Sequence, residues 1–223
     1  MYIRTESTPN EHALKFIPGV PVTTSLVSGT ESAQVFEFTS IREAGPAPLA
    51  RQLFAIDGVS SVLFGPDFVT VNKKPDVTWP QLKPDVFATL MDFFTSGTPL
   101  MLSDVPGQDA AYSGAETRIL PEDSEVVQMI KELLDTRIRP AVQEDGGDIQ
   151  YLGFDDGVVK LKLRGSCRDC ASSAVTLKSG IQNMMIHYIP EVKEVIQVED
   201  EVDAVNAEQL RKVDAAIEAK TRQ

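Results

Sequence analysis

Residues 158–170 read VVKLKLRGSCRDC and hold the only two cysteines of the 223-residue chain, Cys167 and Cys170. Polarity alternates from Val158 to Leu163, which predicts a strand. Beyond the cysteines a helical spacing of apolar residues predicts a helix: Ala174, Leu177, Ile181, Met184, Met185 and Tyr188. Both thiols therefore lie between a strand and the start of a helix. Unpaired backbone N–H groups at a helix start favour thiolate over thiol. The three-residue spacing lets both sulfurs bind the same side of one metal centre.

Two thiolates are half of the four ligands that a zinc or iron–sulfur site usually needs. Three interpretations remain open from the residues alone. Two chains share one iron–sulfur cluster, or the pair is a redox dithiol of the thioredoxin-like kind, or it binds zinc across a dimer as an adaptor. A Cys₂His₂ site within one chain is disfavoured, because the only histidines, His12 and His187, lack the required spacing.

The segments around the cysteines predict a small domain over residues 124–200, in the order α-β-β-α-β. A helix with Ser124 as N-cap carries an apolar face as far as Ile138, and Pro140 ends or kinks it. Strands at 149–154 and 158–163 flank the turn Asp155-Asp156-Gly157, a hairpin signal, and a last strand covers 192–198. The acidic stretch Glu144-Asp145-Gly146-Gly147-Asp148 is a candidate cation site or acid–base pair. Its glycines favour an ordinary polar turn.

The N-terminal part predicts a second α+β domain over residues 1–101. We expect strands at 2–5, 13–17, 59–64 and 68–71, and helices at 49–54 and 79–95, with Phe93 and Phe94 in the core. No chemical motif is visible there, so by elimination this domain recognises partners.

Residues 102–123 lose periodicity and are acidic, which favours a flexible linker over a long surface loop. A polar tail, 201–223, carries a thin stripe of Leu210, Val213 and Ile217.

The composition of the chain argues against several classes of function. The formal net charge of −12 disfavours nucleic acid as a partner, and no apolar run approaches the ~18 residues of a membrane span. The start of the chain, with Glu6 and Glu11, resembles neither a secretory signal nor a transit peptide. Two cysteines in a chain this long favour a reducing compartment. No nucleophile–base constellation or phosphate loop is present, so we expect a protein that is not an enzyme.

Basic residues gather around the cysteines in this acidic chain. They are Lys160, Lys162, Arg164, Arg168 and Lys178. Cations there would offset the charge of an anionic cluster and favour thiolates. The alternative is that alternating lysines form only a solvated strand face.

Both halves of the chain resemble the Nfu family. The C-terminal half is similar to its NifU C-terminal-like domain in Glu144–Asp148, Val159–Leu163, Gly165–Ser173, Thr176–Met184 and Tyr188–Val192. The N-terminal half is similar to its N-domain in Thr8-Pro9-Asn10, Leu14–Gly19, Pro48-Leu49-Ala50, Leu53-Phe54, Gly58-Val59, Phe64–Phe68 and Lys83-Pro84-Asp85. Two independent domains thus match in order, over about residues 1 to 200.

The resemblance implies an iron–sulfur scaffold or carrier that binds a [4Fe–4S] cluster through Cys167 and Cys170, shared between two protomers of a homodimer or higher oligomer. It implies upstream cluster donors and apoprotein clients such as lipoyl synthase-like and aconitase-like enzymes. It also implies the mitochondrial matrix, or the bacterial cytoplasm for bacterial relatives. We expect the thiols to be solvent-accessible, so that ligand exchange is feasible. Ala171 stands where the family usually has proline, which bears on the helix start and not on the ligands.

Overall fold

The computed structural model describes residues 2–23, 34–102, 112–113, 117–168 and 171–198, with backbone alone at 112–113 and 171–176. The elements of the first sheet and its helices are β1 (Arg4–Ser7), β2 (Ala13–Ile17), β3 (Val35–Phe38), α1 (Pro48–Phe54), β4 (Val59–Phe64), β5 (Val69–Lys73), α2 (Trp79–Ser96) and β6 (Tyr112–Ser113). The remaining elements are α3 (Glu125–Leu133), η3 (Leu134–Ile138), α4 (Arg139–Glu144), β7 (Gly147–Asp155), β8 (Val158–Gly165), α5 (Ala171–Tyr188) and β9 (Glu194–Gln197). Each of two sheets has its own hydrophobic cluster, so the fold is α+β with two domains.

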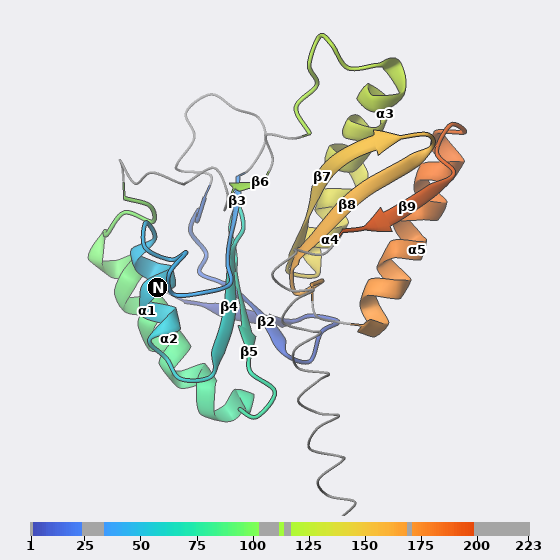
Figure 1. Ribbon diagram of the computed structural model, residues 1–223. Coiled ribbons are helices and arrows are strands. Elements are labelled where there is room, and N and C mark those ends of the chain that lie inside the picture. Colours follow the sequence, from blue (N-terminus) through green and yellow to red (C-terminus); the bar gives the residue numbers. More distant parts are fainter. Residues whose placement is uncertain (1, 24–33, 103–111, 114–116, 169–170, 199–223) are drawn as a thin grey trace, which may run out of the picture.

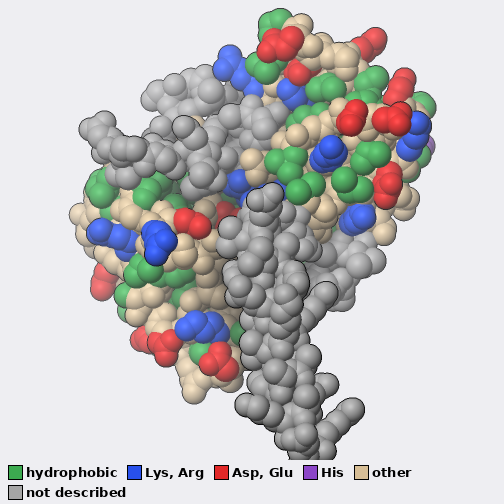
Figure 2. Space-filling model, viewed as in Figure 1, with side chains coloured by type: hydrophobic (Ala, Val, Ile, Leu, Met, Phe, Trp, Pro, Cys, Tyr) green, Lys and Arg blue, Asp and Glu red, His purple; other side chains and the backbone are tan. Residues whose placement is uncertain are grey.

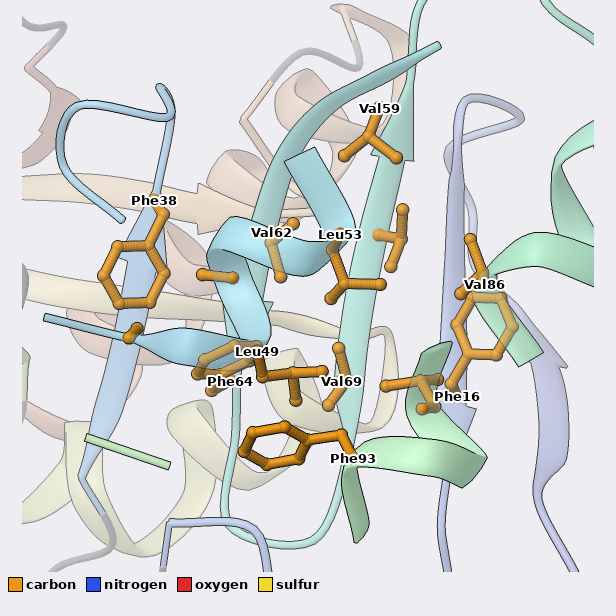
Figure 3. Packing of buried hydrophobic residues seen from close by; sticks show 14 of the residues in the cluster. Phe16, Phe38, Leu49, Leu53, Val59, Val62, Phe64, Val69, Val86 and Phe93 are labelled. Carbon is orange, nitrogen blue, oxygen red and sulfur yellow. The ribbon is translucent and has the colours of Figure 1, made fainter. Parts of the chain in front are cut away.

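The N-terminal sheet has the strand order β1-β2-β5-β4-β3-β6, and every neighbouring pair is antiparallel. Helices α1 and α2 cover one face of this sheet (Figure 1). Their apolar side chains meet those of the strands in one core. Figure 3 shows Leu49 and Leu53 of α1 and Val86 and Phe93 of α2 gathered with the strand residues Phe16, Phe38, Val59, Val62, Phe64 and Val69.

Local signals in the sequence set the ends of α2. The side chains of Thr78 and Gln81 form a capping box at its start. Gly97 ends it in the left-handed conformation, with φ of 69°. Between these ends, helical spacing places four apolar side chains in the core: Leu82, Val86, Leu90 and Phe93.

The C-terminal domain has the predicted α-β-β-α-β order, although its first helix has three segments. Ser124 caps α3 by accepting a hydrogen bond from the backbone N–H of Val127. A π-helical turn, η3, joins α3 to α4, and Pro140 lies in the first turn of α4, so the helical chain continues past the proline as far as Glu144. Strands β7 and β8 form the predicted antiparallel hairpin, and β9 pairs parallel to β8 after the α5 crossover.

Some details differ from the sequence-based expectations. The first strand is Arg4–Ser7 instead of residues 2–5, and β3 was not predicted. Within the expected linker, β6 pairs with β3. Residues 117–123 pack on the C-terminal domain: Lys131 binds the carboxylate of Asp123 at 2.6 Å and the carbonyl oxygen of Arg118 at 2.9 Å. Flexibility of the linker stays a prediction, and the stripe in the C-terminal tail lies outside the described residues.

The C-terminal domain lies against the sheet face opposite α1 and α2 (Figure 1). On the visible surface, acidic and basic side chains are interspersed over both domains (Figure 2). Among the described residues, no helix combines the length and the apolar character needed to cross a bilayer. The contact between the two domains is the feature that positions the candidate site.

Candidate functional site

Cys167 lies in the turn between the end of β8 and the start of α5, as the sequence predicts. The backbone N–H of Arg168 closes this turn on the carbonyl oxygen of Gly165 at 3.2 Å, and Gly165 has φ of 65°. A Cβ at Gly147 would lie 2.5 Å from the Sγ of Cys167, so only glycine fits beneath the sulfur. Cys170 lies outside the described residues. The structure therefore fixes the position of one of the two predicted ligands.

The expectation of a solvent-accessible thiol is wrong for Cys167. The residue is 5% exposed and belongs to the hydrophobic cluster of the C-terminal domain. Gly147 packs beneath the sulfur, and Pro9 of the N-terminal domain lines the same hollow as Cys167. Exchange of a ligand at this sulfur therefore requires the surrounding chain to move.

A hollow of about 360 Å³ opens next to Cys167. Its lining comes from the helices of the C-terminal domain, from the turns that hold Asp145 and Cys167, and from Pro9 of the N-terminal domain. It is largely apolar, with Ile138, Val142, Ile181 and Met184 among the residues around it. Arg137 and Asp145 supply polar groups at this hollow. Burial raises the pKa of Asp145, and the neighbouring charge of Glu144 adds to that effect. The hollow is space next to the sulfur that a ligand or a partner could use.

The acidic stretch at 144–148 runs from the end of α4 through a turn at Asp145 and Gly146 into β7. The carboxylate of Asp148 is fully buried and forms an ion pair of 3.3 Å with the Nε of Arg139. The carbonyl oxygen of Asp145 accepts a hydrogen bond of 2.5 Å from Ser166 Oγ, which ties the turn to the cysteine segment. Over the described ranges, no three His, Cys, Asp or Glu side chains are grouped as a metal site would require.

The N-terminal domain holds the cysteine segment through one row of four side chains. Register places Lys15 opposite Thr70, Thr70 opposite Leu63, and Leu63 opposite Glu37, so the row crosses β2, β5, β4 and β3 on one face. The residues before and after each member belong to the core under α1 and α2, because side chains alternate between the faces of a strand. This row, Lys15-Thr70-Leu63-Glu37, is called the docking row below.

Every member of the docking row touches one of two glycine turns of the C-terminal domain. Lys15 Nζ donates to the carbonyl oxygen of Glu144 at 3.2 Å, and Thr70 Oγ1 donates to that of Gly146 at 2.7 Å. A Cβ on Gly165 would lie 2.7 Å from Leu63 Cδ1. The backbone N–H of Gly165 donates to Glu37 Oε1 at 2.8 Å. The absence of side chains at these glycines thus lets the two domains approach closely.

Two asparagines extend this contact. Asn10 Nδ2 donates to the carbonyl oxygen of Ser166 at 3.0 Å, and Asn72 Nδ2 donates to that of Gly165 at 3.3 Å. Both amides are buried. The backbone on either side of Cys167 is therefore held by hydrogen bonds from another domain, which fixes its conformation in the docked arrangement.

Glu37 is the residue of this site that sequence reasoning missed. It is 7% exposed, and an Oε2 atom lies 3.8 Å from the guanidinium of Arg168. Burial raises its pKa, and the Gly165 N–H together with Arg168, Arg164 and Lys162 partly offset that rise. The available signal was a single carboxylate among apolar residues in Val35-Phe36-Glu37-Phe38.

Part of the predicted basic cluster lies near a carboxylate of the N-terminal domain, and its expected role beside an anionic cluster stays a prediction. Three of its five members act electrostatically on the carboxylate of Glu37. Arg164 is buried and also donates to Gln150 Oε1 at 2.5 Å. The cations near Cys167 therefore serve the contact between the domains in this structure.

Comparison with known proteins agrees with the division of the chain into two domains. Residues 3–97 match the family model described as "Scaffold protein Nfu/NifU N terminal", and residues 130–196 match the NifU-like domain. The human relative named "NFU1 iron-sulfur cluster scaffold homolog, mitochondrial" is 55% identical over 202 residues, which cover 90% of this chain and 73% of the relative.

A relative of the same name from Drosophila willistoni is 51% identical over 203 residues; the match covers 91% of this chain and 65%, less than two thirds, of that relative. Among solved structures, the solution NMR structure of a NifU-like protein from Saccharomyces cerevisiae is 31% identical, with a TM-score of 0.39. It covers 47% of this chain and 87% of its own length.

Proposed function

This chain belongs to the Nfu family of scaffold proteins, and we propose that it receives an iron–sulfur cluster and passes it to apoproteins. The cluster is a [4Fe–4S] core held between two protomers, each of which contributes Cys167 and Cys170. In this role the cluster is cargo. The protein is a carrier and not an enzyme.

The count of thiols carries this proposal. One chain has two cysteines, and four thiolates complete the ligand set of a [4Fe–4S] cluster, so two copies must contribute. The position of Cys167 supports it further. The cysteine lies just after β8, and its partner Cys170 directly precedes α5 in the sequence, so the pair is next to a helix start, where N–H groups favour thiolate. The hollow of about 360 Å³ next to the sulfur supplies room on one side of it.

Transfer of the cluster to a client is possible because two separate chains supply the thiolate ligands. A cluster between two separable chains can be released by exchange of thiolate ligands with a client, because no single polypeptide encloses it. We propose clients of the lipoyl synthase-like and aconitase-like classes, and an upstream donor that delivers the cluster. The relatives are named mitochondrial, which supports the mitochondrial matrix as the place of action.

Anaerobic reconstitution with ferrous iron and sulfide tests the proposal on the full chain. We expect a brown species with absorbance near ~400 nm and about four iron and four sulfide per two chains. The species should form with the protein as a dimer or a higher oligomer, measured by light scattering after gel filtration. Cys167→Ser and Cys170→Ser should each remove most of the bound iron and sulfide.

A matched control is Ser179→Ala, which alters an exposed position of α5 and should keep the wild-type cluster content. The two rival functions give different results. Stoichiometric zinc that iron does not displace would favour the zinc adaptor, and turnover of a disulfide substrate by the monomer would favour the redox protein. A strictly monomeric chain with a full complement of iron and sulfide would contradict shared binding.

A further inference from the structure

The hydrogen-bond donors that flank Cys167 are occupied by a carboxylate from the other domain. Gly165 N–H donates to Glu37 Oε1 at 2.8 Å, and the guanidinium of Arg168 lies 3.8 Å from Glu37 Oε2. These two residues lie two positions before and one position after the cysteine. The carboxylate thus lies where the backbone and side chains around the thiol favour negative charge.

A bound cluster would be stabilised by groups of the same kind. An iron–sulfur core ligated by four thiolates is anionic, and N–H groups and cations next to the sulfurs stabilise it. Glu37 is itself nine-tenths or more buried, so its charge is poorly screened by solvent. An anion at Cys167 and an ionised Glu37 therefore oppose each other, and both draw on the Gly165 N–H and on Arg168.

Resting on the cluster-binding function proposed above, we propose that Glu37 is a positioning residue that occupies the donors beside Cys167 in the empty protein, so that docking of the N-terminal domain and loading of a cluster compete. The carboxylate acts as a stand-in anion. When a cluster binds, the Gly165 N–H and Arg168 interact with it instead of with Glu37. The N-terminal domain then separates from the cysteine segment.

Competition of this kind is reciprocal. If loading weakens docking by a given factor, docking weakens loading by the same factor. The docked arrangement then protects the thiol of the empty protein, since Cys167 is buried in it. Release of a cluster to a client is favoured as the N-terminal domain docks again and takes the donors back.

Acylation of Lys15 measures docking without reference to the cluster. Its Nζ is bonded to the carbonyl oxygen of Glu144 across the domain contact, and the residue is buried. The exposed Lys193 serves as an internal reference in the same sample. The full-length protein is treated with an N-hydroxysuccinimide ester of acetate under argon, empty and after loading with ferrous iron and sulfide, and the two lysines are quantified by mass spectrometry.

In the wild-type protein we expect loading to raise the acylation rate of Lys15, relative to Lys193, by about fivefold or more. Glu37→Gln keeps an oxygen that can accept from the Gly165 N–H but removes the negative charge. The empty variant should therefore label as slowly as wild type, and loading should change its rate by less than about twofold. Equal responses of Lys15 in the loaded wild-type and loaded variant proteins would overturn the proposal.

A second variant keeps the proposal testable if Glu37→Gln disturbs docking by itself. Thr70→Val removes the hydrogen bond to the Gly146 carbonyl oxygen without a change in charge. Weaker docking should let this variant bind the cluster about fivefold more tightly than wild type, measured as the iron and sulfide retained against a competing chelator. Retention at the wild-type level, with Lys15 already exposed, would contradict competition. If no form of the protein binds iron and sulfide, the proposed function itself fails, which is a separate outcome.

Discussion

The backbone amide of Gly165 donates a hydrogen bond of 2.8 Å to Oε1 of Glu37, a residue 128 positions earlier in the chain. The carbonyl oxygen of the same glycine accepts from Asn72 Nδ2 at 3.3 Å. Both peptide groups of the last residue of β8 are thus bound by the N-terminal sheet. The turn that leads to Cys167 is therefore shaped by two domains, and not only by its own sequence.

Gly165→Ala should destabilise the protein. The residue has φ of 65°, and a Cβ there would lie 2.7 Å from Leu63 Cδ1 and 2.9 Å from the Gly146 carbonyl oxygen. Left-handed strain and these overlaps together should lower the free energy of unfolding by about 2 kcal/mol or more, measured by urea denaturation of the empty protein.

The matched control for that variant is Gly180→Ala, at a helical position of α5 where a Cβ meets no atom within 4 Å. Alanine is the better helix former, so this change should raise the free energy of unfolding by about 0.5 to 1 kcal/mol. Equal losses in the two variants would show that close approach at Gly165 has no special role.

Gly147→Ala should reduce cluster content as well as the free energy of unfolding, because a Cβ there would also lie 2.9 Å from the Arg164 carbonyl oxygen. The new Cβ would lie 2.5 Å from Cys167 Sγ, so the sulfur must move away from its present position. We expect iron and sulfide bound after reconstitution to fall by about tenfold, because a ligand misplaced by about an ångström binds poorly. Ser179→Ala, at an exposed position of α5, serves as the control, and unchanged metal content in Gly147→Ala would be evidence against Cys167 as a ligand.

The pH dependence of stability should depend on Glu37. Burial raises the pKa of this carboxyl above its ordinary value of 4.5. The folded protein therefore binds the proton more tightly than the unfolded chain does, and the resulting stabilisation is complete below pH 4.5. It is lost as the pH rises through the raised pKa.

Glu37→Gln should remove this loss, so the urea midpoint of the variant should fall less than that of wild type between acidic and neutral pH. Urea denaturation of the empty protein across a pH series measures the pH dependence of the midpoint. Glu132→Gln, at an exposed position of α3, should reproduce the wild-type profile. A variant profile parallel to wild type would mean that Glu37 carries no such penalty.

Arg139→Met should be strongly destabilising. Arg139 Nε lies 3.3 Å from the fully buried carboxylate of Asp148, and its guanidinium also binds Asp135 and Thr117. Loss of the arginine removes the counter-ion of a buried charge, which typically costs about 3 to 5 kcal/mol.

The double variant Arg139→Met with Asp148→Leu should recover part of that free energy of unfolding, since it removes the buried charge as well. Urea denaturation of the two variants gives the difference. A double variant less stable than Arg139→Met alone would show that Asp148 stabilises the turn by means other than its charge.

Local patterns in the sequence predicted most of the elements, because helical spacing, caps and turn residues act over a few positions. The Ser124 cap, the hairpin at Gly157 and the two strands on either side of Gly65 were predicted in this way. Strand β3 was missed since it has only four residues and pairs with segments distant in the chain.

The docking row could not be predicted from the sequence. Lys15, Thr70 and Glu37 are polar residues in strands where polar and apolar residues alternate. Such alternation normally indicates that the polar side of the strand faces solvent. Their alignment depends on the register of four strands, and register across distant segments leaves no local periodicity. The basic residues near the cysteines were noticed, but their partner carboxylate belongs to the other domain.

The close fit of Gly146 and Gly165 against Thr70 and Leu63 has a consequence for how members of this family diverge. Both glycines also have positive φ, and a Cβ at Gly165 would meet the Gly146 carbonyl oxygen as well as Leu63. The glycines should therefore be retained, and the residues around these glycine–strand pairs should change together on the two sides. A chimera that joins the first half of one relative to the second half of another should pack poorly wherever those pairs are mismatched.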